Sequence, residues 1–183
     1  FLIRVGNAEG QEDYLATANE AYERNLEVLR KATGDIGYFM DELDEVLMAA
    51  LGAIEIISAT GDTEGIEDLD AAIDLVNMSV EGLGTYLDVE VETYALDTYG
   101  PTAITATIAL LNLRYAELLD TPLVEDRLNT GREMMAVVDE KAWAGEAYLF
   151  RPGVEKRYLY PNVVSIMANT TAYRLTGEEA YRE

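Results

Sequence analysis

Residues 57–69, with the sequence ISATGDTEGIEDL, decide how the chain is expected to fold, because they predict a turn between two helices. Gly61 can adopt the left-handed conformation that ends a helix, and the acidic residues after it suit the start of the next one. Such a turn recurs, which predicts that one helix–turn–helix unit is used several times. The related segments are RKATGD at 30–35, LLDTPLVEDRL at 118–128 and RLTGEEAY at 174–181.

A helix opens after each turn, and these openings repeat at intervals of roughly 55 residues, enough for two long helices and a loop. At the third opening, Thr121 and Pro122 are typical of an N-cap and a first helical residue. Each of these helices is expected to be amphipathic, with acidic residues between the members of one apolar stripe. The stripes are Leu15, Ala18, Tyr22, Leu26 and Leu29, and then Ile66, Leu69, Ile73, Val76, Val80 and Leu83.

The helix before each turn is apolar nearly all round, as in VLMAALGAIEII at 46–57 and VVSIMANTTAY at 163–173. A helix without a polar face is expected to be buried on several sides. Alternation of the two kinds predicts an inner layer of helices wrapped by an outer layer. The outer helices are predicted at about 12–32, 63–87 and 122–142, and the inner helices at about 41–60, 102–119 and 162–176.

The sequence therefore predicts an all-α fold of repeated antiparallel helix hairpins in two layers. All 183 residues are assigned to one domain, with repeats near 12–60, 63–119 and 122–176. The exception to the helical pattern is AYLFRPGVEKRYLY at 147–160, where two apolar–aromatic arms flank Pro152 and Gly153. These residues are compatible with a small hairpin.

Charge is the strongest signal in the composition, since 35 Asp and Glu stand against 13 Lys and Arg and give a net charge of −22. Nucleic-acid binding and anionic membranes are excluded, because both require basic residues against phosphate. Membrane insertion is not expected either, because no apolar run approaches the ~20 residues of a span. An acidic, lysine-poor surface suits a high-salt habitat, although an ordinary acidic protein has the same composition.

The chain contains neither Cys nor His. Disulfides, thiolate zinc sites and cysteine nucleophiles are thereby excluded, and so is the commonest acid–base group near neutral pH. We expect no metal site and no cofactor. The compartment stays open, since a cytoplasmic and a secreted protein can both lack cysteine.

The alternation of an inner helix, an ATGD-like turn and an outer helix opening with Tyr-Leu and small residues resembles the (α/α) toroids. These include the six-hairpin glycosidases and the N-acylglucosamine 2-epimerase-like proteins. Residues 37–62 and 160–181 are also similar to the helical part of thioredoxin-domain proteins related to spermatogenesis-associated protein. The resemblance implies an (α/α) toroid with its site where long loops enter the inner helices. It rests on helix pattern and turns, so it bears on architecture more than on chemistry.

Such toroids usually close with about six hairpins, whereas this chain holds about three. We therefore expect a fragment of a longer polypeptide, whose inner helices are covered by further repeats. The alternative is an open arc covered by a partner chain.

The loops expected to carry a site are residues 35–41, 88–101 and 144–161, and the last two are rich in residues that grip sugars. Aromatic faces stack on the apolar faces of sugars, while carboxylates and Arg bind hydroxyl groups. Aromatic residues in long loops more often serve packing, so both interpretations stand. The ligand-binding candidates are Glu42, Tyr94, Tyr99, Trp143, Tyr148, Arg151, Tyr158, Tyr160 and Asn162.

Glycoside hydrolysis needs two carboxyl groups that flank the scissile bond. Asp41 stands at the start of one inner helix and Asp97 just before the next, which makes them the candidates for a facing catalytic pair. Acidic residues at a helix start are more often there for capping and for the helix dipole. The epimerase-like enzymes rely on histidines, which this chain lacks, so the resemblance does not extend to that activity.

The sequence leaves two alternative functions open. The first is a carbohydrate-active or glycan-binding toroid protein, in its catalytic form a glycoside hydrolase-like enzyme, with its site at the loop-rich end of the inner helices. The second is a non-catalytic structural or protein-interaction module of an acidic surface or secreted assembly. The expected partners are a glycan or small polar ligand, together with repeats or a partner chain over the inner helices.

Overall fold

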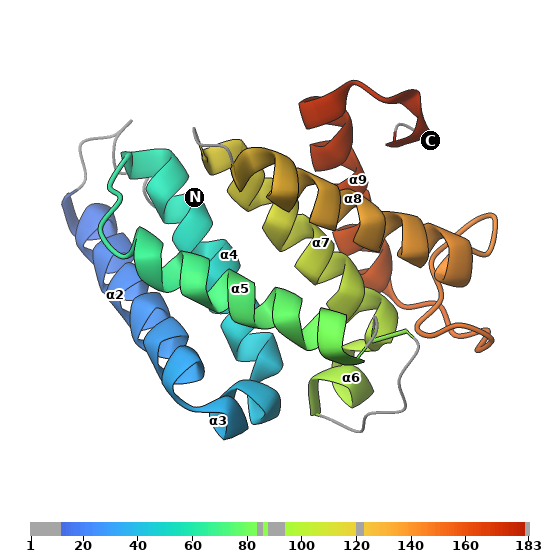
Figure 1. Cartoon of the computed structure of the whole chain (residues 1–183), viewed down its shortest axis with the longest axis horizontal. Coiled ribbons are helices and arrows are strands. Elements are labelled where there is room, and N and C mark those ends of the chain that lie inside the picture. Colours follow the sequence, from blue (N-terminus) through green and yellow to red (C-terminus); the bar gives the residue numbers. More distant parts are fainter. Residues whose placement is uncertain (1–11, 84–85, 88–93, 120–122, 182–183) are drawn as a thin grey trace. The chain divides into compact units, whose positions relative to one another are not determined.

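The computed structural model describes residues 12–83, 86–87, 94–119 and 123–181, and for residues 12–15 and 81–83 it describes the backbone alone. Helices make up most of these residues, so the predicted all-α fold is confirmed (Figure 1). The helices are α2 Glu12–Gly34, α3 Ile36–Asp41, α4 Leu43–Thr60, α5 Ile66–Leu83, α6 Tyr94–Tyr99, α7 Pro101–Leu118, α8 Leu123–Ala142, α9 Leu159–Thr176 and the 3-10 helix η1 Glu179–Tyr181.

The chain divides into two compact units, residues 1–75 and 76–183, and the division falls inside α5. The assignment of residues 1–183 to one repeat domain stays a prediction, and so does the toroid.

In the first unit, α2 packs against α4 through one apolar stripe (Figure 1). The stripe predicted for this outer helix is confirmed from Ala18 onward, because Tyr22, Leu26 and Leu29 are buried while the acidic residues between them are exposed. Leu15 lies outside the residues whose side chains are described. α4 is buried along one side, while Glu45, Met48, Glu55 and Ser58 on its other side are exposed, so the expectation that this apolar helix is buried on several sides is wrong. Its buried residues are Leu43, Val46, Leu47, Ala49, Ala50, Ala53, Ile54 and Ile57.

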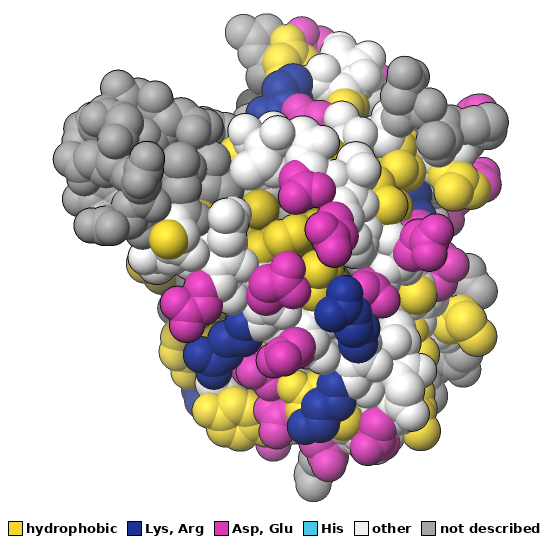
Figure 2. Space-filling model, turned by 90° about the vertical axis from the view of Figure 1, so that its left-hand side faces the viewer, with side chains coloured by type: hydrophobic (Ala, Val, Ile, Leu, Met, Phe, Trp, Pro, Cys, Tyr) yellow, Lys and Arg dark blue, Asp and Glu magenta, His cyan; other side chains and the backbone are white. Residues whose placement is uncertain are grey.

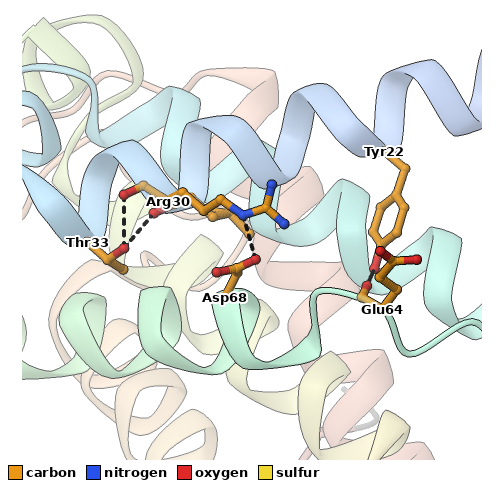
Figure 3. A network of polar contacts seen from close by, with 6 residues as sticks. Tyr22, Arg30, Thr33, Glu64 and Asp68 are labelled. Atoms are coloured by element: carbon orange, nitrogen blue, oxygen red, sulfur yellow. Dashed lines mark hydrogen bonds and ion pairs between the residues drawn. The ribbon is translucent and has the colours of Figure 1, made fainter.

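The turn after α4 ends the helix as predicted. Gly61 is left-handed, with φ 72°, and its N–H donates to the Ile57 carbonyl oxygen at 2.8 Å. Two contacts then tie the turn and the start of α5 to α2 (Figure 3): the Tyr22 hydroxyl donates to the Glu64 carbonyl oxygen, and Arg30 Nε lies 2.8 Å from Asp68 Oδ2. These two contacts therefore hold the turn and the start of α5 against α2.

The prediction of a loop at residues 35–41 is wrong, because α3 occupies this segment. The Asp35 carboxylate accepts hydrogen bonds from the N–H groups of Gly37 and Tyr38, at 2.9 and 3.2 Å, and so caps a new helix directly after α2. As a consequence Asp41 ends α3 and does not begin an inner helix. Glu42 is the N-cap of α4, but its side chain makes no capping hydrogen bond.

In the second unit, α7 packs against both α8 and α9 (Figure 1). Every residue of α7 from Pro101 to Leu113 is buried, which confirms the prediction of an inner helix without a wet face. Gly131 on α8 allows a close approach of the two helices, since a Cβ there would lie 2.7 Å from Leu113 Cγ. The Thr121–Pro122 cap predicted for α8 falls outside the described residues.

α9 differs from the prediction in two ways. It begins at Leu159, three residues before the predicted start, and Tyr158 is its N-cap. One of its sides is buried against the unit, through Val164, Ala168 and Ala172, but its opposite side is exposed although apolar. The expectation that an apolar helix is buried on several sides is therefore wrong for α9, because no described element covers that side.

Acidic side chains are spread over the side of the molecule that Figure 2 shows, with Lys and Arg between them. Among the described residues, no helix has the length and apolar character that a membrane span requires.

Candidate functional site

The second unit contains most of the predicted site residues, and the segment between α8 and α9 arranges them. Two isolated bridges fold this segment, one between Trp143 and Tyr148 and one between Arg151 and Val154. Gly153 has φ 75°, so the small reversal expected at Pro152 and Gly153 is present.

The same segment packs against Gly100, at the start of α7. Gly100 has φ 86°, and a Cβ there would lie 2.6 Å from both the ring and the carbonyl oxygen of Phe150. Only glycine tolerates that backbone conformation and that approach. The segment is thereby held against the start of α7, as the prediction of a loop-rich end requires.

Tyr148 lies at the centre of a polar cluster that we call the Tyr148 cluster, consisting of Asp139, Tyr148, Asn162 and Asn169. The Tyr148 hydroxyl donates to Asp139 Oδ1 and accepts a hydrogen bond from Asn169 Nδ2 at 3.0 Å. Asn162 holds the Tyr148 backbone from both sides: its Oδ1 accepts from the Tyr148 N–H at 2.8 Å, and its Nδ2 donates to the Tyr148 carbonyl oxygen at 3.1 Å. The cluster therefore joins α8, the connecting segment and α9.

The electrostatics of the cluster follow from its burial. Burial raises the pKa of the Asp139 carboxyl, and hydrogen bonds from Tyr148 and Asn169 partly oppose that rise. Burial also raises the pKa of Tyr148, and the neighbouring Asp139 raises it further, so the phenol stays protonated. Asn169 Oδ1 is buried and has no hydrogen-bond partner among the described residues. Within the described part of the chain, one acceptor of the cluster is thus without a donor.

Aromatic rings form three pairs in this unit, and one of these pairs includes Tyr148. Trp143 packs on Tyr148 with ring centroids 5.0 Å apart, and 46% of the Trp143 surface is exposed. Phe150 and Tyr158 form a second pair at 5.0 Å, and Tyr99 and Tyr160 a third at 5.4 Å. Of these rings Trp143 and Tyr158 are exposed, and exposed rings can stack on a flat apolar surface of a ligand.

The remaining candidates lie elsewhere. Arg151 is exposed, with its guanidinium carbon 5.9 Å from the Phe150 ring centre. Tyr94 and Asp97 are exposed on α6, and no described hydrogen bond links them to the Tyr148 cluster. The predicted loop at 88–101 therefore contains a short helix, while residues 88–93 lie outside the described residues.

Asp41 and Glu42 are exposed in the first unit. Asp97 belongs to the second unit, so the facing pair of Asp41 and Asp97 stays a prediction. Within the described residues no three or more acidic side chains form a group that could hold a metal ion.

Asp139 and Asn169 are the members of the cluster that the sequence did not indicate as ligand residues. The sequence contains only a weak indication of these two residues. Asp139 is one acid among 35, and Asn169 shares its side of α9 with Asn162 because the two are seven residues apart. That spacing indicates that Asn169 lies near Asn162, and no comparable pattern indicates Asp139.

Comparison with protein-family models, curated proteins and solved structures gives no match. The similarity to (α/α) toroids therefore stays a prediction.

Proposed function

We propose that the second unit binds a glycan, or a small polar ligand of similar shape, on the aromatic surface beside the Tyr148 cluster. The observation that carries the proposal is the position of Trp143, which is half exposed and packed on Tyr148. A sugar ring presents an apolar face to an aromatic side chain and hydroxyl groups to polar side chains next to it.

The polar groups beside Trp143 support this ligand class. Asp139 and Asn169 hold the Tyr148 hydroxyl, so the ring on which Trp143 rests is fixed in place. Fixed aromatic rings lose little conformational entropy when a ligand binds. Arg151 and Tyr158, both exposed on the connecting segment, add a cation and a phenol that can bind hydroxyl groups.

Glycan binding at this surface does not require that the glycan is also hydrolysed. Hydrolysis would need two carboxyl groups on either side of a scissile bond. The described contacts place one carboxyl group, that of Asp139, in the cluster.

The test uses the fact that Trp143 is the only tryptophan in the chain. A panel of oligosaccharides is titrated while the Trp143 emission is recorded, and hits are confirmed by calorimetry. Stacking on the indole is expected to shift and quench the emission. Trp143→Ala should then weaken binding by about tenfold or more, as loss of a stacking platform typically does.

Tyr94→Ala is the matched control, because Tyr94 is an exposed aromatic residue on α6 outside the cluster. Its affinity should equal that of the unchanged protein. A panel that produces no emission change and no heat, or a hit that Trp143→Ala leaves unaltered, would show that the surface does not bind glycans.

A further inference from the structure

Asp139 on α8 and Asn169 on α9 meet at Tyr148, and the hydrogen-bonding groups of the Asn169 amide are unequally used. Its Nδ2 donates to the Tyr148 hydroxyl at 3.0 Å, and a hydrogen bond from the same amide to the Asp139 carboxyl partly opposes the rise in the pKa of that carboxyl. The amide therefore lies beside both groups. Its Oδ1 is buried, and no residue in the described part of the chain donates to it.

The missing donor is one proton away from Asn169. A buried acceptor without a donor is destabilising, so a native fold rarely contains one. An ionised carboxylate can only accept hydrogen bonds, whereas a protonated carboxyl also has an O–H group that donates. Asp139 is already in contact with the amide. A single proton on Asp139 would thus give Asn169 Oδ1 the donor that it lacks.

The surroundings of Asp139 favour uptake of that proton. Burial raises the pKa of its carboxyl, and no described charged side chain contributes to the rise. From the connecting segment the carboxyl faces the Tyr148 phenol, which stays protonated, and from α9 it faces the neutral amide of Asn169. α7 packs against both α8 and α9 and has no charged residue at 101–113. The neighbouring acid on α8, Glu140, is exposed.

We propose that Asp139, Tyr148 and Asn169 form a pH-sensitive latch between α8 and α9. In the ionised form the Asp139 carboxylate accepts from the Tyr148 hydroxyl, and Asn169 Oδ1 stays unpaired. When Asp139 takes up a proton from solvent, its O–H donates to Asn169 Oδ1, while its other oxygen still accepts from Tyr148. One hydrogen bond is added across the junction and one buried charge is removed, so the junction is tighter at low pH. The latch goes beyond glycan binding and does not depend on it.

The central variant is Asp139→Asn, because the side-chain amide of Asn has the donor and the acceptor of a protonated carboxyl and no charge. Glu140→Gln is its matched control, since it removes one exposed acid directly beside Asp139. Asn169→Ala removes the acceptor. The double variant Asp139→Asn/Asn169→Ala completes the cycle. Urea unfolding of the full chain is followed by the emission of Trp143, which lies in the same unit.

At pH 7 Asp139→Asn should lower the unfolding equilibrium constant about fivefold beyond Glu140→Gln, which corresponds to about one hydrogen bond. With Ala at position 169 the same substitution should bring no such gain. A group whose folded pKa is raised stabilises the fold at low pH and loses that effect as pH rises through the folded pKa. The difference between Asp139→Asn and the unchanged protein should therefore close as the pH is lowered toward 3.5.

The Trp143 emission without urea is a second measurement, because the Trp143 ring packs on Tyr148. It should change with pH in the unchanged protein and in Glu140→Gln, and Asp139→Asn should abolish that change. Circular dichroism verifies that each variant is folded, and Asn169→Leu takes the place of Asn169→Ala if the smaller side chain unfolds the unit.

Three results would each overturn the latch. A loss of stability in Asp139→Asn at pH 7 would mean that the ionised carboxylate is the better partner of Tyr148. An equal gain with Ala at position 169 would assign the gain to the removal of a charge, with no bond to Asn169. An emission change that persists in Asp139→Asn would assign the titration to a different group.

Discussion

The amide pair between Asn77 and Asn112 offers the sharpest test of how the second unit is held together. Asn77 Nδ2 donates to Asn112 Oδ1 at 2.9 Å, and Asn112 Nδ2 donates to Asn77 Oδ1 at 2.8 Å. Both side chains are buried, Asn112 completely. The pair therefore links α5 to α7 inside the core of the second unit.

Asn112→Leu keeps the volume of the side chain but leaves the amide N–H and carbonyl of Asn77 without their partners. Each buried polar group left unpaired costs about 1–3 kcal/mol. Asn77 keeps a small exposed fraction that admits water, so we expect a loss of about 2–4 kcal/mol for the two groups together. Asn77→Leu should cost a similar amount for the same reason.

The double variant Asn77→Leu/Asn112→Leu removes both amides at once and leaves no unpaired group. Replacing both partners by apolar groups of similar shape is nearly neutral, so its stability should return to within about 1 kcal/mol of the unchanged protein. The coupling energy of the cycle should then be at least about 2 kcal/mol. Asn129→Leu, on the exposed side of α8, is the control and should change stability by less than about 0.5 kcal/mol.

The assay is urea unfolding followed by the emission of Trp143, which lies in the second unit and so reports on that unit. The urea dependence of the unfolding free energy should be the same for all variants. Losses that simply add in the double variant would refute the reasoning, because they would mean that the two amides stabilise the fold separately.

Three further predictions follow from single features. Gly100→Ala should lower the free energy of unfolding in urea by about 1 kcal/mol or more beyond the loss caused by Gly145→Ala. Both glycines have positive φ, but only a Cβ at position 100 would meet Phe150, at 2.6 Å. Equal losses in the two variants would show that no clash occurs. The folded-state pKa of Asp139 is raised, so its contribution to stability is complete below the unfolded pKa near 3.8 and is lost as pH rises through the folded pKa. Asp139→Asn should thus cost more at pH 3.5 than at pH 7, and the opposite order would contradict the assigned burial. Raising NaCl from about 0.1 to about 1 M shortens the electrostatic screening length from about 10 to about 3 Å. The free energy of unfolding should then increase, because the chain has a net charge of −22 and screening weakens its self-repulsion. An unchanged midpoint of urea unfolding would refute a role of self-repulsion.

The long helices could be predicted because their patterns are local. The run at 103–113 has no charged residue, and a helix of that composition has no stable place at the surface, so α7 is buried all round. Tyr22 and Leu26 recur at helical spacing between acids, which fixes the buried side of α2. The short helix α3 was missed because its cap, Asp35, follows α2 directly and resembles part of the turn.

The site could be predicted only in outline, because its contacts join segments that are distant in the chain. Aromatic residues between α8 and α9 indicated the region of the proposed site. Nothing in the local sequence pairs Asp139 with Tyr148, or Tyr148 with Asn169, since those partners are selected by how α8 and α9 pack on α7. For the same reason, the sequence could not reveal that one side of α9 lacks a cover.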